Sequence, residues 1–155
     1  MSGDKDTKVI VLSNKFDAVR KSITGAMLAK AITAGAFIVE TYAKRNASRG
    51  RPGLNVITGN LINSIHTEPA STSGTLAEVN VGTNVEYAAI QEFGGIIKPR
   101  FAKMLAWMQD GVLIFAKLVQ IPARPYLRPA FDEHDDEIRT AVETQLRAQI
   151  EDACK

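Results

Sequence analysis

The segment His134–Glu137 is the first place in this sequence where side chains could do chemistry. It reads His-Asp-Asp-Glu, and on a helix its first and last residues would share one face. Imidazole and carboxylate groups are common metal ligands, but no HExxH pattern accompanies them and His66 is the only other histidine. We therefore interpret the segment as the acidic start of a helix, where the helix dipole favours negative charge.

Other reactive side chains lack the neighbours that catalysis needs. Cys154 is the only cysteine, and no base lies near it in the sequence, so we expect neither a thiolate nucleophile nor an intramolecular disulfide. Glu86 and Glu92 are six residues apart and would face different sides of a helix. No glycine-rich phosphate loop is present. The sequence therefore predicts a protein that is not an enzyme, with no catalytic residues, no metal and no cofactor.

The composition is that of an ordinary globular chain. Its 155 residues are 45% hydrophobic and 23% charged, which predicts a single domain over residues 1–155, with residues 1–7 as a flexible tail. No apolar run approaches the roughly 18 residues of a membrane span. The N-terminal MSGDKDTK is polar, so we expect no signal peptide and no membrane contact.

The net charge of +2 hides an uneven distribution along the chain. Residues 1–130 contain sixteen basic and nine acidic residues, a balance of +7, whereas residues 131–155 contain three basic and eight acidic, a balance of −5. Opposite charges of this kind allow copies of a chain to pair, although a solvated acidic helix is the plain alternative. The basic loop, defined as residues 44–51, could contact an acidic surface, nucleic-acid phosphates or only solvent.

Hydrophobic periodicity and turn signals predict an α+β fold. The expected elements are a strand at Lys8–Ser13, a long helix at Lys15–Asn46, a hairpin that turns at 70–74, a short helix at Tyr87–Phe93 and a last helix at Pro129–Ala153. Gly94 and Gly95 would end the short helix.

Asp110-Gly111 is the strongest turn signal, because Asp-Gly suits the positive φ angles of a type I′ turn. A two-residue loop there predicts four cross-strand pairs: Leu105–Ala116, Ala106–Phe115, Trp107–Ile114 and Met108–Leu113. Both faces of this hairpin would be apolar. Either the domain buries both faces, or a partner covers one of them.

Four segments in this order resemble a known family. They are TGNLINSI at Thr58–Ile65, VGTNVEYAAIQEFGG at Val81–Gly95, the Asp110-Gly111 hairpin and PARPYLRPAF at Pro122–Phe131. Over roughly Val9 to Ile150 they resemble the tail-completion, or head–tail joining, minor tail proteins of tailed bacteriophages. The resemblance implies a long N-terminal helix packed on a small antiparallel β-sheet, a protruding β-hairpin and a C-terminal helix.

The resemblance also implies a function. The chain would be a structural virion protein that forms a ring, with a hexamer favoured, at the neck between head connector and tail tube. Its partners would be further copies, the head connector, the tail tube or tail terminator, and DNA passing through the ring. It would be located in the virion and, during assembly, in the host cytoplasm. The alternative is a small nucleic-acid-binding module that uses the basic loop.

Structural roles can be assigned to several residues of these motifs. Glu92 is a charge among apolar neighbours, so its burial requires a partner, and Arg124 or Arg128 could supply a forked ion pair. Tyr87, Ala88 and Phe93 would give the short helix an apolar side. The structural motif set is Tyr87, Glu92, Phe93, Gly94, Arg124, Pro125, Arg128 and Pro129.

We expect the hairpin around Trp107 to join subunits, with charge setting their orientation: the acidic last helix of one copy would lie near the basic loop of the next. The expected interface residues are Trp107, Met108, Leu113, Phe115, Arg45, Arg49, Arg51, Glu133 and Asp136.

Overall fold

The structure is a computed structural model that describes residues 23–50, 54, 58–74 and 76–153. The expected N-terminal tail, the strand at Lys8–Ser13, the first part of the predicted long helix, Arg51 and Cys154 lie outside these residues. The chain is grouped into two compact units, which take their described residues from 1–40, 67–81 and 134–155 and from 41–66 and 82–133. The expectation of one domain stays a prediction.

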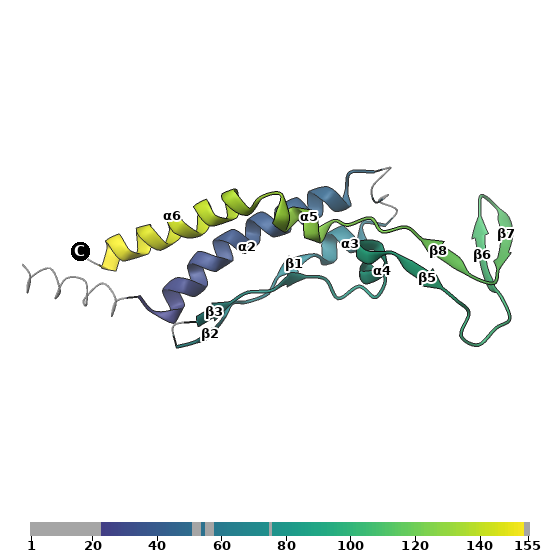
Figure 1. Ribbon diagram of the computed structural model, residues 1–155, viewed down its shortest axis with the longest axis horizontal. Helices are drawn as coiled ribbons and strands as arrows, with labels where there is room; N and C mark the ends of the chain where they lie inside the picture. Colours follow the sequence, from purple (N-terminus) through teal and green to yellow (C-terminus); the bar gives the residue numbers. More distant parts are fainter. Residues whose placement is uncertain (1–22, 51–53, 55–57, 75, 154–155) are drawn as a thin grey trace, which may run out of the picture. The chain divides into compact units, whose positions relative to one another are not determined.

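Helices and short strands alternate along the chain, as the α+β prediction requires (Figure 1). The helices are α2 (Gly25–Ala47), α3 (Asn60–Ser64), α4 (Ala88–Phe93), α5 (Leu127–Asp132) and α6 (Asp135–Ala153). The strands are β1 (His66–Thr67), β2 (Ser71–Ser73), β3 (Leu76–Glu78), β4 (Val81–Gly82), β5 (Gly95–Ile97), β6 (Leu105–Gln109), β7 (Val112–Ala116) and β8 (Val119–Ile121). They pair as β1 with β4, β2 with β3, β5 with β8 and β6 with β7, so the described strands form small pairs, not one sheet.

Helix α2 begins later than its periodicity suggested. Residues 23 and 24 are not helical, and the backbone N–H of Met27 donates to Oγ1 of Thr24 over 3.3 Å. A threonine oxygen that accepts from the first turn is a common N-cap. The prediction of an unbroken helix from Lys15 is therefore wrong at this point, because the Thr24 cap starts the helix at Gly25.

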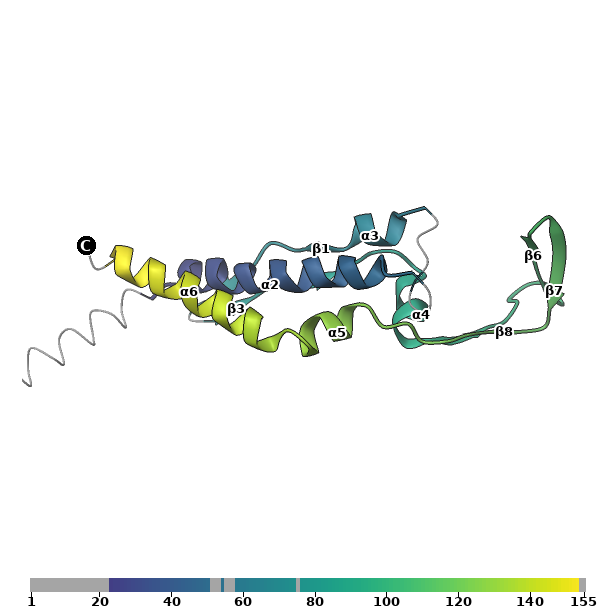
Figure 2. The same ribbon diagram turned by 90° about the horizontal axis from the view of Figure 1, so that it is seen from above.

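In the first unit, small residues of α2 allow α6 to approach closely (Figure 2). A Cβ atom added at Gly35 would lie 2.9 Å from a methyl carbon of Val142 and 3.0 Å from one of Ile138. Ala31 and Ala36 are buried. Further along, the side-chain amide of Gln149 donates to the Met27 carbonyl over 3.1 Å. The small residues of the long helix thus have a partner that the sequence did not indicate, namely the last helix.

By length and composition alone, α2 could cross a membrane. This finding corrects the expectation that no apolar stretch approaches such a length. Core helices pass the same test, however, and α2 carries buried small residues where it packs against α6. The side of α2 that includes Gly35 therefore packs against α6 within the first unit.

The strands of the first unit are tied to α2 by one carboxylate. Glu40 accepts hydrogen bonds from the backbone N–H of Thr67 at 2.8 Å and from its hydroxyl at 2.6 Å. The hairpin beyond this point turns later than expected. Ser71–Ser73 forms strand β2 and pairs with β3, so these residues of the predicted turn are strand. Gly74, whose φ is 60°, does belong to the turn.

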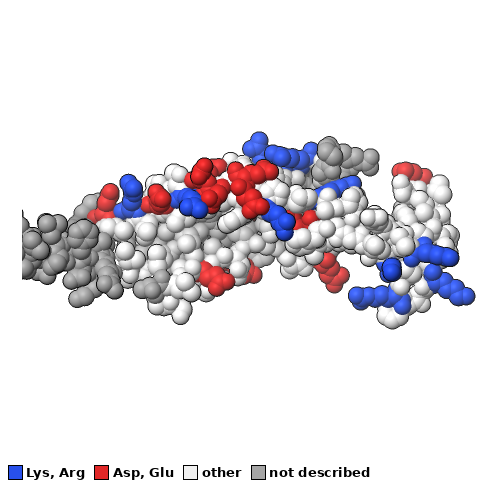
Figure 3. All heavy atoms as spheres, viewed as in Figure 1, with Lys and Arg blue, Asp and Glu red and all other residues white. Residues whose placement is uncertain are grey.

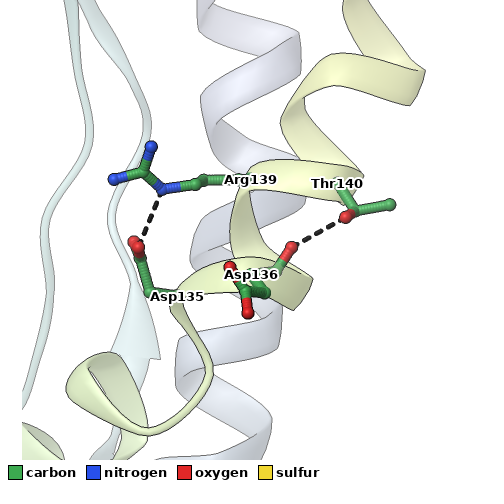
Figure 4. Close-up of polar contacts among 4 residues, drawn as sticks. All are labelled: Asp135, Asp136, Arg139 and Thr140. Atoms are coloured by element: carbon green, nitrogen blue, oxygen red, sulfur yellow. Dashed lines mark hydrogen bonds and ion pairs between the residues drawn. The ribbon is translucent and has the colours of Figure 1, made fainter.

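The predicted last helix is two helices. The backbone N–H of Glu133 donates to the Pro129 carbonyl over 3.0 Å at the end of α5, and α6 starts at Asp135. The new helix opens with three acidic residues, which its dipole favours at that end. Asp135 pairs with Arg139 one turn on, at 2.7 Å (Figure 4). An ion pair this exposed contributes little to stability. We attribute the break between α5 and α6 to the acidic residues that start a second helix at Asp135.

Gly94 ends α4 in a conformation that suits only glycine. Its φ is 69° and its ψ is 178°, a region that side chains with a Cβ atom avoid. An added Cβ would also lie 2.7 Å from the backbone nitrogen of Ala123 and 2.9 Å from the carbonyl oxygen of Ile121. The backbone of the returning strand therefore passes where a side chain would be.

Gly94→Val is accordingly expected to lower the free energy of unfolding by roughly 2 kcal/mol or more, because backbone strain adds to overpacking. Gly82→Val is the matched control, since Gly82 has open space around it and no positive φ. Denaturant titration of both variants measures the effect. Equal midpoints for Gly94→Val and the wild type would contradict it.

Candidate interaction surface

The buried carboxylate of Glu92 holds the start of α5. Glu92 is 8% exposed. Its Oε2 accepts from the backbone N–H of Tyr126 at 2.7 Å and of Leu127 at 3.0 Å, and its Oε1 accepts from that of Arg128 at 2.9 Å. A side chain of α4 thus caps another helix 34 residues further along the chain.

This cap accounts for every orphan donor at the start of α5. The first four N–H groups of a helix have no partner within it. Tyr126, Leu127 and Arg128 donate theirs to Glu92, and Pro129 at the fourth position has no N–H. The Tyr-Leu-Arg-Pro sequence therefore presents three donors, which the two oxygens of one carboxylate can accept.

A further hydrogen bond holds the backbone of Tyr126. Its carbonyl oxygen accepts from the side-chain amide of the buried Asn46, over 3.1 Å. The preceding segment is tied to α4, since the N–H of Arg124 donates to the Gln91 carbonyl over 2.7 Å. Glu92 and Tyr126 thus form the centre of a junction, which we call the α4–α5 clamp, that also includes Gln91, Arg124 and Arg128.

Two expectations about this junction are wrong. Glu92 accepts from three backbone N–H groups, and the ion pair predicted with Arg124 or Arg128 is not formed. Nor is Phe93 on a buried side of α4, because it is 67% exposed. The buried residues of α4 are Ala88 and Glu92, and the guanidinium carbon of Arg128 lies 6.0 Å from the Phe93 ring centroid.

The clamp supports a two-stranded ribbon that leads to the predicted hairpin. Strand β5 follows Gly94 and pairs antiparallel with β8, which ends just before the Pro122–Phe131 segment. Between them, β6 and β7 pair in the predicted register, including Trp107 opposite Ile114. Asp110 and Gly111 have φ angles of 51° and 81°, as a type I′ turn requires. We call residues 95–121 the arm.

One face of the hairpin is uncovered. Met108 is 64% exposed, Leu113 54% and Phe115 57%, whereas Trp107 and Ile114, which pair on the opposite face, are half-buried. Of the two alternatives, burial of both faces by the chain itself is therefore wrong. In the described part of the chain β6 and β7 pair only with each other, and the exposure of these three side chains shows that the face they form is uncovered.

The arm also carries basic residues that the sequence alone did not single out. Lys98, Arg100, Lys103 and Lys117 are all exposed, and Figure 3 shows blue side chains gathered near the hairpin. Phe101 among them is fully exposed. The β5–β8 pairing ends with Ile97 opposite Val119, so Lys98 and Lys117 lie one and two residues beyond the same end of this ribbon although they are distant in the sequence. The available signal was the basic excess around the Asp-Gly turn, where three basic residues of the arm precede the turn and one follows it.

The other expected interface residues lie apart from the hairpin in the sequence and are exposed, apart from Arg51, which is outside the described residues. The basic loop is in part helical, since Lys44 and Arg45 form the last turn of α2, where the dipole favours positive charge. Arg49 follows in a turn. Glu133 lies between α5 and α6, and Asp136 is in the first turn of α6.

Within the described part of the chain, no three His, Cys, Asp or Glu side chains come close enough together to hold a metal ion. Among the titratable groups of the described residues, the one with a clearly shifted pKa belongs to the clamp. Burial, together with the Glu92 charge, raises the pKa of Tyr126 from 10.0 to about 12. The geometry thus offers an apolar arm on a rigid base, a surface suited to binding.

Comparison with protein families identifies the class of protein. Residues 11–94 match the HK97-gp10-like family, described as a tail component of bacteriophage HK97-gp10 type. The match covers more than half of the chain and includes the Tyr87–Gly94 motif. The chain belongs to this family of phage tail structural components, as its motifs indicated. Comparisons with curated proteins and with solved structures gave no significant match.

Glu92→Gln tests the clamp. The amide places an N–H₂ group against backbone donors, so we expect the free energy of unfolding to fall by about 1–3 kcal/mol. Glu86→Gln, at an exposed position just before the same helix, is the control and should change little. Hydrogen exchange adds a local readout: the amides of residues 126–128 should lose protection selectively. Unchanged exchange there would contradict the cap.

Tyr126 predicts a pH dependence. Below pH 10 the hydroxyl is protonated in both states. Above pH 10 it ionises in the unfolded chain but stays neutral when folded, because its folded pKa is raised to about 12. Stability should therefore fall between these values by about 1.4 kcal/mol per pH unit. Tyr126→Phe should lack this part of the decline in denaturant titrations from about pH 9 to 11.5, and identical slopes would contradict the assignment.

Proposed function

We propose that this chain is a structural neck protein of a tailed phage or prophage, which forms a ring between the head connector and the tail tube. Membership of a phage tail-component family supports a structural role in the virion. A ring would place the same surface of each copy against its neighbour, and its outer faces would dock the head and tail proteins. The role requires binding and no catalysis.

The observation that carries the proposal is the uncovered apolar face of the hairpin. A two-stranded ribbon is marginal in water by itself, and contiguous exposed apolar side chains on it mark an interaction site. Met108, Leu113 and Phe115 provide such a face, while the α4–α5 clamp holds the ribbon at its base. A neighbouring subunit or the tail tube would bury this face on assembly.

The runner-up is a nucleic-acid-binding module that uses the basic loop. Two of its basic residues belong to the end of α2, and their charge is already favourable for that helix end. A ring around DNA is also compatible with contacts to phosphate. Duplex binding that falls steeply with salt, without defined oligomers, would favour the module over the ring.

Phe115→Asp should abolish or strongly weaken assembly while the chain stays folded, because it places a charge in the apolar contact and its side chain is exposed in the free chain. Arg49→Ala should have a smaller effect, since a surface charge pair contributes about 0–1 kcal/mol. Trp107→Asp is a poorer probe, because Trp107 pairs with Ile114 within the hairpin.

Sedimentation of both variants against the wild type measures assembly, and circular dichroism controls for folding. Normal assembly of Phe115→Asp would show that the hairpin face is not an interface. A greater loss with Arg49→Ala would transfer the contact to the basic loop.

A further inference from the structure

Basic residues lie next to the hairpin, and they are not part of the apolar face that the proposed function assigns to assembly. Residues 95–121 contain four basic residues and one acidic residue, Asp110, which leaves a balance of +3. The basic collar, defined as Lys98, Arg100, Lys103 and Lys117, is exposed. In the described part of the chain no ion pair neutralises any of its members. The exposed side chains of Phe101, Met104 and Leu118 lie in the same two loops.

The same chain offers a surface of opposite charge. Residues 132–137 contain five acidic residues and no lysine or arginine. Arg139 engages Asp135 but not Asp136, whose exposed side chain takes no part in that pair (Figure 4). An exposed aromatic residue, Phe131, precedes the segment. We call residues 131–137 the acidic segment.

We propose that the basic collar of one copy docks on the acidic segment of a second copy. The proposal rests on the proposed ring, and it names the two surfaces that would meet there. Charge complementarity selects this pairing, and each surface adds exposed apolar side chains that a purely electrostatic contact would lack. In the proposed ring each copy would offer its collar to one neighbour and its acidic segment to the other, a heterologous contact that forms a closed ring when the rotation between copies closes.

The collar suits this role better than the basic loop. Lys44 and Arg45 lie at the C-terminal end of α2, where their charge already serves the helix, and their neighbours Asn46 and Ala47 are buried. The collar, in contrast, combines four cations with exposed aromatic and aliphatic groups. Duplex DNA would attract the same cations, but the chain itself supplies an acidic counterpart, with five acidic residues for the four basic residues of the collar.

Charge reversal tests the pairing in the full-length chain. One variant carries Lys98→Glu with Lys103→Glu, and the other carries Glu133→Lys with Asp136→Lys. All four side chains are exposed, so folding should be retained. Each variant alone should self-associate at least about tenfold more weakly than the wild type in sedimentation at moderate salt. Arg100→Glu with Lys117→Glu provides a second collar variant should the first fail to fold.

An equimolar mixture of the two variants should recover assembly. The reversed collar of one then faces the reversed acidic segment of the other, and their two unchanged surfaces are complementary as well. Arg45→Glu with Arg49→Glu is the matched control: it should assemble nearly as the wild type does.

Three results would overturn the pairing. Wild-type rings together with a mixture that assembles no better than either variant would reject the pairing and leave the ring intact. Loss of binding to a duplex DNA oligonucleotide in the collar variant, with self-association unchanged, would assign the collar to nucleic acid. A wild-type chain that stays monomeric at every concentration would reject the proposed ring and this contact together.

Discussion

The second unit is organised around the buried carboxylate of Glu92. An ionised carboxylate removed from water is costly unless its oxygens accept hydrogen bonds. Here the acceptors meet three backbone donors that would themselves be unsatisfied at the start of α5. The backbone N–H groups compensate the loss of water around the carboxylate, and the carboxylate satisfies N–H groups that would otherwise have no partner. As a result α4 and α5, which are distant in the sequence, have one defined placement against each other.

That placement determines where the arm begins. Gly94 directly follows α4 and lets the backbone of residues 121–123 pass within contact of its Cα, so the two strands of the ribbon leave the clamp side by side. The ribbon and hairpin then extend without a covering layer, which is why so many apolar side chains of the arm are exposed. A rigid base and an uncovered apolar end are the properties of a binding element.

Three carboxylates among the described residues serve structure. Glu92 caps a helix, Glu40 holds the backbone and hydroxyl of Thr67, and Asp135 pairs with Arg139 along α6. Each of these carboxylates accepts a hydrogen bond from another residue of the same chain. This use of charge agrees with membership of a family of phage tail structural components.

Elements with local causes were predictable from the amino-acid sequence. The type I′ turn and the register of β6 and β7 follow from Asp110-Gly111 and the spacing of the apolar residues, and the end of α4 follows from Gly94. Helix α2 and the α+β class were also predictable, because hydrophobic periodicity is a property of short windows. The family was recognisable from its sequence motifs alone.

The contacts of the motif residues, in contrast, depend on how distant segments pack. The partner of Glu92 is a set of backbone N–H groups, which carry no side-chain signature in a sequence, so the sequence pointed to an arginine instead. The collar became visible once the pairing of β5 with β8 showed that Lys98 and Lys117 lie just beyond the same end of this ribbon. The exposure of Phe93 and Phe115 likewise depends on which layers are present around them. Burial and long-range pairing are set by the packing of distant segments, whereas turns and helix ends are set by neighbouring residues.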